Sequence, residues 1–329
     1  MHHNKKEKRN RRRWLSLGMT CLMWLMCLPA EAQRPLRILE WNVENLFSTT
    51  HNEGHNDQEF MPEGSHHWTS SRYWRKLDEV GKTIVDCGDS IGLPAVIALC
   101  EVEDDSVMTH LTQRSVLRTS GYQYVMTDSP DRRGVDVALL YHPALFRLTG
   151  HHSIRIPSVE HGFSPTRDLL YACGITPSHD TLHIIVCHLP SKTGGVKNTS
   201  GHRKLVVQTL RHTIDSVLTR SPKARLIVMG DFNATSRESL FRQLTPPLRE
   251  TLPTSRRELN RPVGTYYFQG LWSYLDHILV SPTVHTTGPA HEVRLPHLLN
   301  ADGTPHRTYR GPTYSGGISD HLPLCLDIL

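Results

Sequence analysis

Short apolar runs recur along the chain, and each is bounded by polar or turn-forming residues. They fall at residues 36–41, 94–100, 122–127, 136–141, 168–175, 181–187, 225–229, 275–280 and 322–328. Runs of this length are typical of buried strands rather than helices. Some runs follow one another without a helical pattern between them, as at 122–141 and 168–187, which favours hairpins and mixed sheets over a purely parallel sheet.

Two longer segments carry the spacing of amphipathic helices. "RYWRKLDEVGKTIVDC" follows Thr69 or Ser70, either of which is a good helix N-cap. "RKLVVQTLRHTIDSVL" places Leu205, Leu210, Ile214 and Val217 on one face. Strands with interspersed helices predict an α/β sandwich, and no linker or internal repeat divides residues 33–329, so we expect one domain there.

The N-terminal residues 1–32 have the features of a secretory signal peptide. The basic stretch "KKEKRNRRR" precedes the apolar run "WLSLGMTCLMWLMCLPA", and Ala30-Glu31-Ala32 is a small-x-small cleavage site. At about 17 residues the apolar run is shorter than the roughly 20 that a membrane span needs. We therefore expect cleavage before Gln33 and a mature protein in the periplasm or outside the cell.

Removing the signal peptide changes the charge balance. It takes away seven of the 37 lysines and arginines and two of the 32 acidic residues, which leaves 30 of each in residues 33–329. Proteins that grip nucleic acid non-specifically usually carry a basic surplus. Any basic patch on the mature protein must therefore be local.

Five cysteines remain after residue 32: Cys87, Cys100, Cys173, Cys187 and Cys325. The odd count without CxxC spacing argues against a zinc site and against a dense disulfide framework. Cys100, Cys187 and Cys325 lie in apolar runs, where a free thiol behaves as a small core residue.

Several apolar runs end at a residue that is able to bind a metal or move a proton. "LRILEW" leads into Asn42, "AVIALC" into Glu101, "LHIIVC" into His188, and "RLIVMG" into Asp231 with Asn233 two residues later. A single example is well explained as a turn. The recurrence favours a site at one edge of the sheets.

The types of residue indicate the chemistry of that site. Asn42, Glu101 and Asp320 offer oxygen ligands, and no thiolate stands near them in sequence, which favours Mg²⁺ or Mn²⁺ over zinc. His188 and His321 are suited to carry protons or contact phosphate.

The motifs together resemble those of the endonuclease/exonuclease/phosphatase superfamily, which includes pancreatic-type deoxyribonucleases, abasic-site endonucleases, inositol-polyphosphate phosphatases and sphingomyelinases. "LRILEWNVENLF", "VIALCEVED", "IIVCHLPSK", "LIVMGDFNATS", "SYLDHILVS" and "GGISDHLPL" occur in the family's order and span residues 36–328. The resemblance implies a four-layer α/β sandwich, in which two packed mixed β-sheets are flanked by helices. It also implies metal-dependent hydrolysis of phosphoester bonds.

The resemblance further assigns roles to the motif residues. Asn42 and Glu101, with Asp320, are expected to hold Mg²⁺, with Mn²⁺ or Ca²⁺ as alternatives. Asp231 is the expected base and Asn233 is expected to direct the attacking water, because residues two apart at a strand end point to the same side.

The two histidines are each expected to have an orienting carboxylate. Asp276 in "YLDHILV" matches the family's partner of His321, and Asp128 in "YVMTDSP" resembles the partner of His188. Arg167 in "SPTRDLLYACGI" resembles the arginine that reaches the substrate phosphate, a task suited to a guanidinium.

Departures from the family pattern limit the assignment. His277 stands where relatives often carry an apolar ring, as a packing substitution or as an extra polar group. A tyrosine of the abasic-site branch has no match here, which disfavours repair of abasic DNA. The segment 48–68 is either a second metal site or, as we favour, a solvated insertion, and its Phe60, Met61 and Trp68 are the candidates for an apolar rim.

Other features have simpler interpretations. "SKTGGVKN" is expected to form a turn rather than a phosphate loop. Most of the remaining histidines are expected at the surface, among them His151, His152, His179 and His212.

Three classes of function follow in order of preference. The first is an exported nuclease or phosphodiesterase acting on DNA or RNA. The second is a phospholipid (sphingomyelinase-like) or other small phosphoester hydrolase, and the third is a binding domain without activity. No obligate protein partner is evident, and a monomer is expected.

Overall fold

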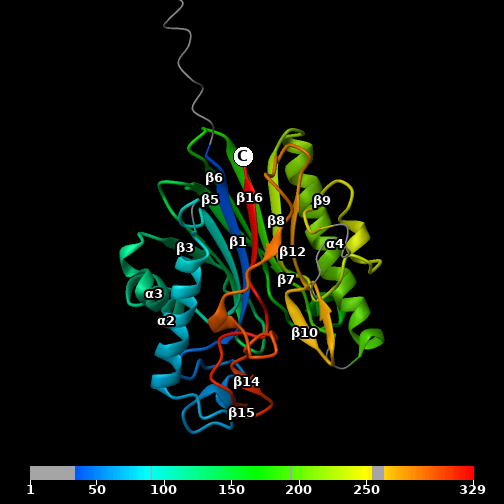
Figure 1. Ribbon diagram of the computed structural model, residues 1–329. Coiled ribbons are helices and arrows are strands. Elements are labelled where there is room, and N and C mark those ends of the chain that lie inside the picture. Colours follow the sequence, from blue (N-terminus) through cyan, green and yellow to red (C-terminus); the bar gives the residue numbers. More distant parts are fainter. Residues whose placement is uncertain (1–33, 90, 193–194, 254–262) are drawn as a thin grey trace, which may run out of the picture. The chain divides into compact units, whose positions relative to one another are not determined.

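The apolar runs form the strands of two six-stranded mixed sheets in the computed structural model of the chain (Figure 1). The structure describes residues 34–89, 91–192, 195–253 and 263–329, so the predicted signal peptide lies outside the described residues, as does part of "SKTGGVKN". Residues Pro35–Leu329 form one compact unit.

The first sheet joins the two ends of this unit. Its order is β13 (His291–Glu292), β16 (Leu324–Ile328), β1 (Leu36–Leu46), β2 (Val96–Val102), β4 (Asp136–Tyr141) and β3 (Gln123–Met126). β1 and β2 are parallel, whereas β1 and β16 are antiparallel with Leu36 opposite Ile328. The 122–141 segment is the expected hairpin.

The second sheet repeats this plan. Its order is β5 (Arg147–Ile154), β6 (Leu169–Ile175), β7 (Thr181–His188), β8 (Arg225–Asp231), β12 (Asp276–Val280) and β9 (Arg249–Glu250). β7 and β8 are parallel and the other pairs are antiparallel. Two small hairpins stand apart, formed by β10 (Tyr266–Phe268) with β11 (Leu271–Ser273) and by β14 (Tyr309–Arg310) with β15 (Thr313–Tyr314).

Helices cover the outer faces of the two sheets (Figure 1). The α-helices are α2 (Ser70–Asp86), α3 (Asp105–Gln113) and α4 (Val196–Arg220), and short 3-10 turns are η1 (Gln58–Phe60), η2 (Val116–Thr119), η3 (Val159–His161), η4 (Phe241–Gln243) and η6 (Pro296–Leu298). The Thr69 side chain caps α2 by accepting from Arg72 N, one of the two predicted caps. α2 and α3 pack on the first sheet and α4 packs on the second.

The alternation of side chains builds four layers. On β1, Ile38 faces the second sheet in the central core, whereas Leu39 and Trp41 face α2 and α3. On α4, Leu210 and Ile214 are buried against the second sheet. The predicted four-layer sandwich of two mixed sheets is therefore confirmed.

The 48–68 segment is exposed along much of its length, as expected of a solvated insertion, but two of its aromatic rings are not. Phe60 and Trp68 are buried at 6% and 0% exposure, and Trp68 Nε1 donates to Phe47 O at 2.9 Å. These rings join the core beneath α2, so they cannot form an apolar rim. Among the described residues, no helix is both long enough and apolar enough to cross a membrane.

Candidate active site

A row of three polar residues crosses the end of the second sheet. His188 is the register partner of Asp231 on the parallel strand β8, and Asp231 is the partner of Asp276 on the antiparallel strand β12. Adjacent strands lie about 4.8 Å apart, so this register brings the three side chains together without any further device.

Asn42 connects the first sheet to this row. It shares with Ile38 the face of β1 that looks toward the second sheet. Its Nδ2 donates to Asp231 Oδ2 at 3.0 Å, and its Oδ1 accepts from Glu44 N at 2.9 Å. The site is thus assembled between the two sheets.

Glu101 follows Cys100 at an irregularity of β2, with a positive φ of 66°. Its carboxylate accepts from Asn45 N at 2.9 Å and lies 3.4 Å from Arg133 Nη2 and 3.9 Å from His188 Nε2. Although burial raises it, the charge of Arg133 and the hydrogen bond from Asn45 N lower the pKa of Glu101 to about 2. Glu101 is therefore an ionised oxygen donor.

His321 is held by the predicted carboxylate. Its Nδ1 bonds Asp276 Oδ2 at 2.7 Å, and its Nε2 lies 3.9 Å from Asp231 Oδ2 and 4.0 Å from Asp320 Oδ1. Although burial lowers it, the charge and hydrogen bond of Asp276 hold the pKa of His321 well above its usual range. His321 is an imidazolium that faces Asp231.

His188 has the opposite character. Burial, aided by Arg167, holds the pKa of His188 well below its usual range, so the ring is neutral. Its Nε2 lies 3.6 Å from Asp231 Oδ2, and its Nδ1 has no hydrogen-bond partner among the described residues.

The predicted pairing of Asp128 with His188 is wrong in this structure. Asp128 is exposed. The loop that follows β3 instead turns Asp131 inward, where it accepts from Arg167 Nη1. Asp136, the buried first residue of β4, accepts from Thr127 Oγ1 at 2.5 Å. Since buried carboxylates need such partners, the two inner acids take the polar contacts and Asp128 stays in solvent.

Asn233 reaches Asp231 by a route that differs from the one expected. β8 ends at Asp231, and Asn233 has a left-handed φ of 47°, so the two do not share a strand face. Asn233 N donates to Asp231 Oδ1 at 2.8 Å, and Asn233 Nδ2 donates to Leu189 O at 3.0 Å. The turn fixes the Asp231 carboxylate, whose pKa burial raises to about 7.

Arg167 makes hydrogen bonds inside the protein, although the resemblance assigns it to the substrate phosphate. Its Nη1 donates to Asp131 Oδ2 at 2.7 Å and its Nη2 to Leu189 O at 3.1 Å, inside the protein. Arg133, which the sequence reasoning missed, has a side chain 46% exposed beside Glu101. Its position directly after Asp131 and Arg132 in a polar loop gives no signal that would have found it.

The last two predicted residues lie at the margins of the row. Asp320 Oδ2 lies 3.0 Å from Arg307 Nη2. His277 is fully buried; its Nδ1 lies 2.8 Å from Glu250 Oε1 and its Nε2 lies 2.8 Å from Ala234 O. His277 therefore packs in the interior and also holds Glu250 and the backbone after Asp231 through its two ring nitrogens.

The donor atoms fit a hard divalent cation. Asp231, Asp276 and His321 have ligand atoms within 4.8 Å of one another, and no such group of three among the described residues includes Glu101 or Asp320. Burial raises the pKa of the Cys100 and Cys187 thiols, so neither supplies a thiolate. Carboxylate oxygens suit magnesium or manganese better than soft metals, and His321 can act as a ligand only when its Nε2 has lost its proton.

The fold is that of a phosphoesterase family. A sequence profile described as the Endonuclease/Exonuclease/phosphatase family matches residues 37–329, and the chain belongs to that family. It is therefore a hydrolase of phosphoester bonds, in a family whose members depend on divalent metals. No curated protein sequence matches the chain.

Solved structures share the fold at low sequence identity. The human Nocturnin catalytic domain with bound sulfate anion is 19% identical, with a TM-score of 0.60 over 90% of this chain and 95% of that one. D. rerio TDP2 complexed with single strand DNA product is 14% identical, with a TM-score of 0.57 over 90% and 99%. A Bacteroides thetaiotaomicron mannosyl-6-phosphatase is 13% identical, with a TM-score of 0.58 over 89% and 99%.

Proposed function

We propose that the chain is an exported, Mg²⁺-dependent nuclease or phosphodiesterase that uses an activated water on DNA or RNA. The observation that carries the proposal is the position of Asp231 between a neutral and a protonated histidine, with Oδ2 lying 3.6 Å from His188 Nε2 and 3.9 Å from His321 Nε2. Hydrolysis of a phosphoester needs a base for water and donors for the phosphoryl oxygens, and this arrangement supplies both.

The residues divide the reaction between them. Asp231, with a pKa raised by burial to about 7, accepts the proton of the attacking water near neutral pH. His321, kept protonated by Asp276, donates to a phosphoryl or leaving oxygen. His188 remains neutral and donates from Nε2 to a non-bridging oxygen.

The metal role belongs to the ionised carboxylate. Glu101 with Asn42 would hold the cation, Asp320 would add a further oxygen, and the Asp231, Asp276 and His321 cluster is the alternative position. A bound divalent cation supplies Lewis-acid neutralisation of the charge that develops on phosphate.

The substrate class is a separate choice from the chemistry of the site. Similar folds carry a single-strand DNA product in one structure and the name of a sugar phosphatase in another. Function on a shared fold resides in the rim. Export is supported by the sequence of residues 1–32, and no partner protein is proposed.

A second candidate is a phospholipid hydrolase. It is favoured by the tip of the β10–β11 hairpin, where Phe268 and Leu271 are 53% and 72% exposed. Such side chains suit insertion at a lipid surface.

The test is a substrate panel with purified residues 33–329. We expect Mg²⁺-dependent cleavage of DNA or RNA, and slow turnover of sphingomyelin, inositol phosphates and a sugar phosphate. Rapid hydrolysis of a phospholipid with no nucleic acid cleavage would replace the proposal by the second candidate. Secretion is read separately, from the N-terminus of exported protein, where Gln33 is expected and a retained Met1 contradicts export.

The metal assignment has its own test. Glu101→Gln should weaken Mg²⁺ binding in calorimetry by about tenfold or more, whereas Asp231→Asn should abolish turnover with a smaller change in binding. Glu160→Gln, at an exposed position of η3, is the matched control. Unchanged binding in Glu101→Gln together with lost binding in Asp276→Asn would place the metal in the alternative cluster.

A further inference from the structure

A series of three rings leads outward from the catalytic centre. The centroids of His321 and Tyr266 are 4.8 Å apart, and those of Tyr266 and Phe268 are 6.3 Å apart with planes 20° from parallel. Tyr266 also forms a backbone bridge with His321. Since Tyr266 and Phe268 are two apart on β10 they share a face, and the outermost ring, Phe268, remains half exposed.

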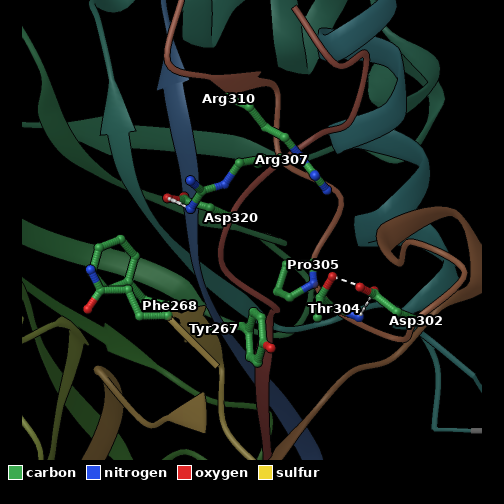
Figure 2. Close-up of a pocket in the computed structure, with 9 residues that line it drawn as sticks. Tyr267, Phe268, Asp302, Thr304, Pro305, Arg307, Arg310 and Asp320 are labelled. Atoms are coloured by element: carbon green, nitrogen blue, oxygen red, sulfur yellow. Dashed lines mark hydrogen bonds and ion pairs between the residues drawn. The ribbon is translucent and has the colours of Figure 1, made fainter. Parts of the chain in front are cut away.

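A cavity of about 270 Å³ lies beside this hairpin. Figure 2 shows Tyr267 and Phe268 on one side and Arg307, Arg310 and Asp320 on the other, with Asp302, Thr304 and Pro305 along the third wall. Asp320 belongs to both places, because its Oδ1 lies 4.0 Å from His321 Nε2. The cavity therefore borders the catalytic centre at Asp320.

The two arginines of the cavity differ in their side-chain contacts. Arg307 Nη2 donates to Asp320 Oδ2 at 3.0 Å. The Arg310 side chain is exposed and makes no side-chain hydrogen bond or ion pair within the part of the chain that the structure describes, although its charge acts on Asp302. The Asp302 carboxylate accepts two hydrogen bonds at Oδ1, from Thr304 N and from Thr304 Oγ1. The cavity therefore carries an exposed cation, Arg310, and an exposed aromatic ring, Phe268.

We propose that this cavity, with Phe268 and Arg310, binds the nucleotide that flanks the scissile phosphate in single-stranded nucleic acid. The base extends the series of rings by stacking on Phe268, and a phosphate accepts from Arg310. A base within a duplex is covered by its neighbours, so a single strand is the preferred substrate. The inference rests on the proposed function and names its substrate class.

The contacts favour a nucleotide over a lipid surface. A membrane-binding rim requires a broad apolar area with basic residues around it, whereas here two rings and two arginines line a small cavity that also contains two carboxylates. Leu271 lies opposite Phe268 in the hairpin and is even more exposed, yet it does not line the cavity. A substitution of Leu271 therefore distinguishes binding of a nucleotide from binding to a lipid surface.

The experiment measures binding of a short fluorescent oligodeoxynucleotide by anisotropy, with Mg²⁺ and in an Asp231→Asn background so that nothing is consumed. Phe268→Ala should weaken binding about 5- to 150-fold, the range found for stacking of one base on an aromatic ring. Phe268→Tyr should restore it. An otherwise identical oligonucleotide with an abasic unit beside the target phosphate should lose the effect of Phe268→Ala.

Matched variants test the remaining parts. Leu271→Ala should leave oligonucleotide binding within about twofold. Arg310→Gln should reduce the slope of log affinity against log salt by about 0.7, the value of one single-strand phosphate contact, whereas Arg118→Gln, exposed but outside the cavity, should not.

Two outcomes overturn the inference. One is equal weakening of the normal and abasic oligonucleotides by Phe268→Ala. The other is equal loss of binding to phosphatidylcholine–sphingomyelin vesicles in Phe268→Ala and Leu271→Ala, without an effect on the oligonucleotide. Failure of the proposed function is separate, because it appears as absence of cleavage by the parent protein even where the stacking variants change oligonucleotide binding as expected.

Discussion

Asp231 and Asp276 are opposite each other on neighbouring strands, yet their surroundings give them different chemistry. Asp276 bonds His321 Nδ1 at 2.7 Å and so serves as the anion that keeps the imidazole charged. Asp231 accepts hydrogen bonds from Asn42 Nδ2 and Asn233 N, and burial raises the pKa of Asp231 to about 7. A base poised near neutral pH beside an acid kept protonated is the division that hydrolysis requires.

At this scale we predict the effect of Asp276→Asn. The variant removes the charge that raises the pKa of His321, so the pKa of His321 falls. His321 works as the protonated acid, and activity is lost as the pH rises through its pKa, so the alkaline loss of kcat should move to lower pH. At neutral pH kcat should fall about 10- to 100-fold, by analogy with other orienting carboxylates.

The matched control is Asp327→Asn, which removes a carboxylate paired with Arg37 at the other end of β1. Its pH profile should match that of the parent. An unchanged alkaline limb in Asp276→Asn would show that His321 is not the acid.

The site residues that the sequence predicts well are those at strand ends. Asp231 and His188 follow apolar runs, Asp276 begins one and is assigned from the family resemblance, and register then places the three side by side. Asp128 and Arg167 could not be assigned in this way, because Asp128, Asp131 and Asp136 lie within one polar stretch. Which of them turns inward depends on loop packing against Arg167, and no periodicity encodes that.

Among the elements, β8 has the tightest steric requirement. At Gly230, with φ 145°, an added Cβ would lie 1.8 Å from the backbone oxygen of Cys187 on β7. The parallel pair β7 and β8 therefore approaches closely one residue before His188 and Asp231.

We predict that Gly230→Ala lowers the free energy of unfolding by about 2–3 kcal/mol, because β7 and β8 must separate to admit the methyl group. Activity should fall further than stability explains, since His188 and Asp231 move apart. Denaturant unfolding and kcat are the measurements. Gly150→Ala on β5, where an added Cβ meets nothing within 4 Å, should change neither by much.

The elements that the sequence does not predict share a physical cause. β5 is a polar edge strand, "RLTGHHSI", and most of its side chains are exposed, so it lacks the apolar alternation that marks a strand. α3 is a short helix whose Asp104 cap follows directly on β2. Both are held by neighbours rather than by their own pattern.

For the whole molecule, the balance of 30 bases and 30 acids after residue 32 predicts a shallow salt dependence of nucleic acid binding. Each phosphate contact contributes a slope of about −0.7 to −0.9 in log affinity against log salt, so a total of about −1 to −3 is expected. Anisotropy between 50 and 300 mM salt, about the range in which such slopes are read, measures it. A slope near about −6 would require a long basic track and contradict the balance.

The thiols give a second prediction at this scale. Cys87, Cys100, Cys187 and Cys325 are free and buried, and burial raises the pKa of each. Iodoacetamide should therefore label native residues 33–329 at Cys173, the partly exposed thiol, and the other four only after unfolding. Mass spectrometry reads the result, and labelling of Cys187 in the folded protein would mean that β7 opens locally.

The pairing of β1 with β16 has a consequence for the order of events during synthesis. Arg37 and Asp327 are bonded across this pair although they are 290 positions apart, and His321 lies just before β16. The first sheet cannot close, and Asn42 cannot meet Asp231 beside His321, until nearly all of residues 36–328 have left the ribosome. Such long-range pairing is slow to form. If the chain is exported as proposed and reaches the membrane still unfolded, the catalytic groups meet only after it has crossed, so its own cell is not exposed to the assembled hydrolase.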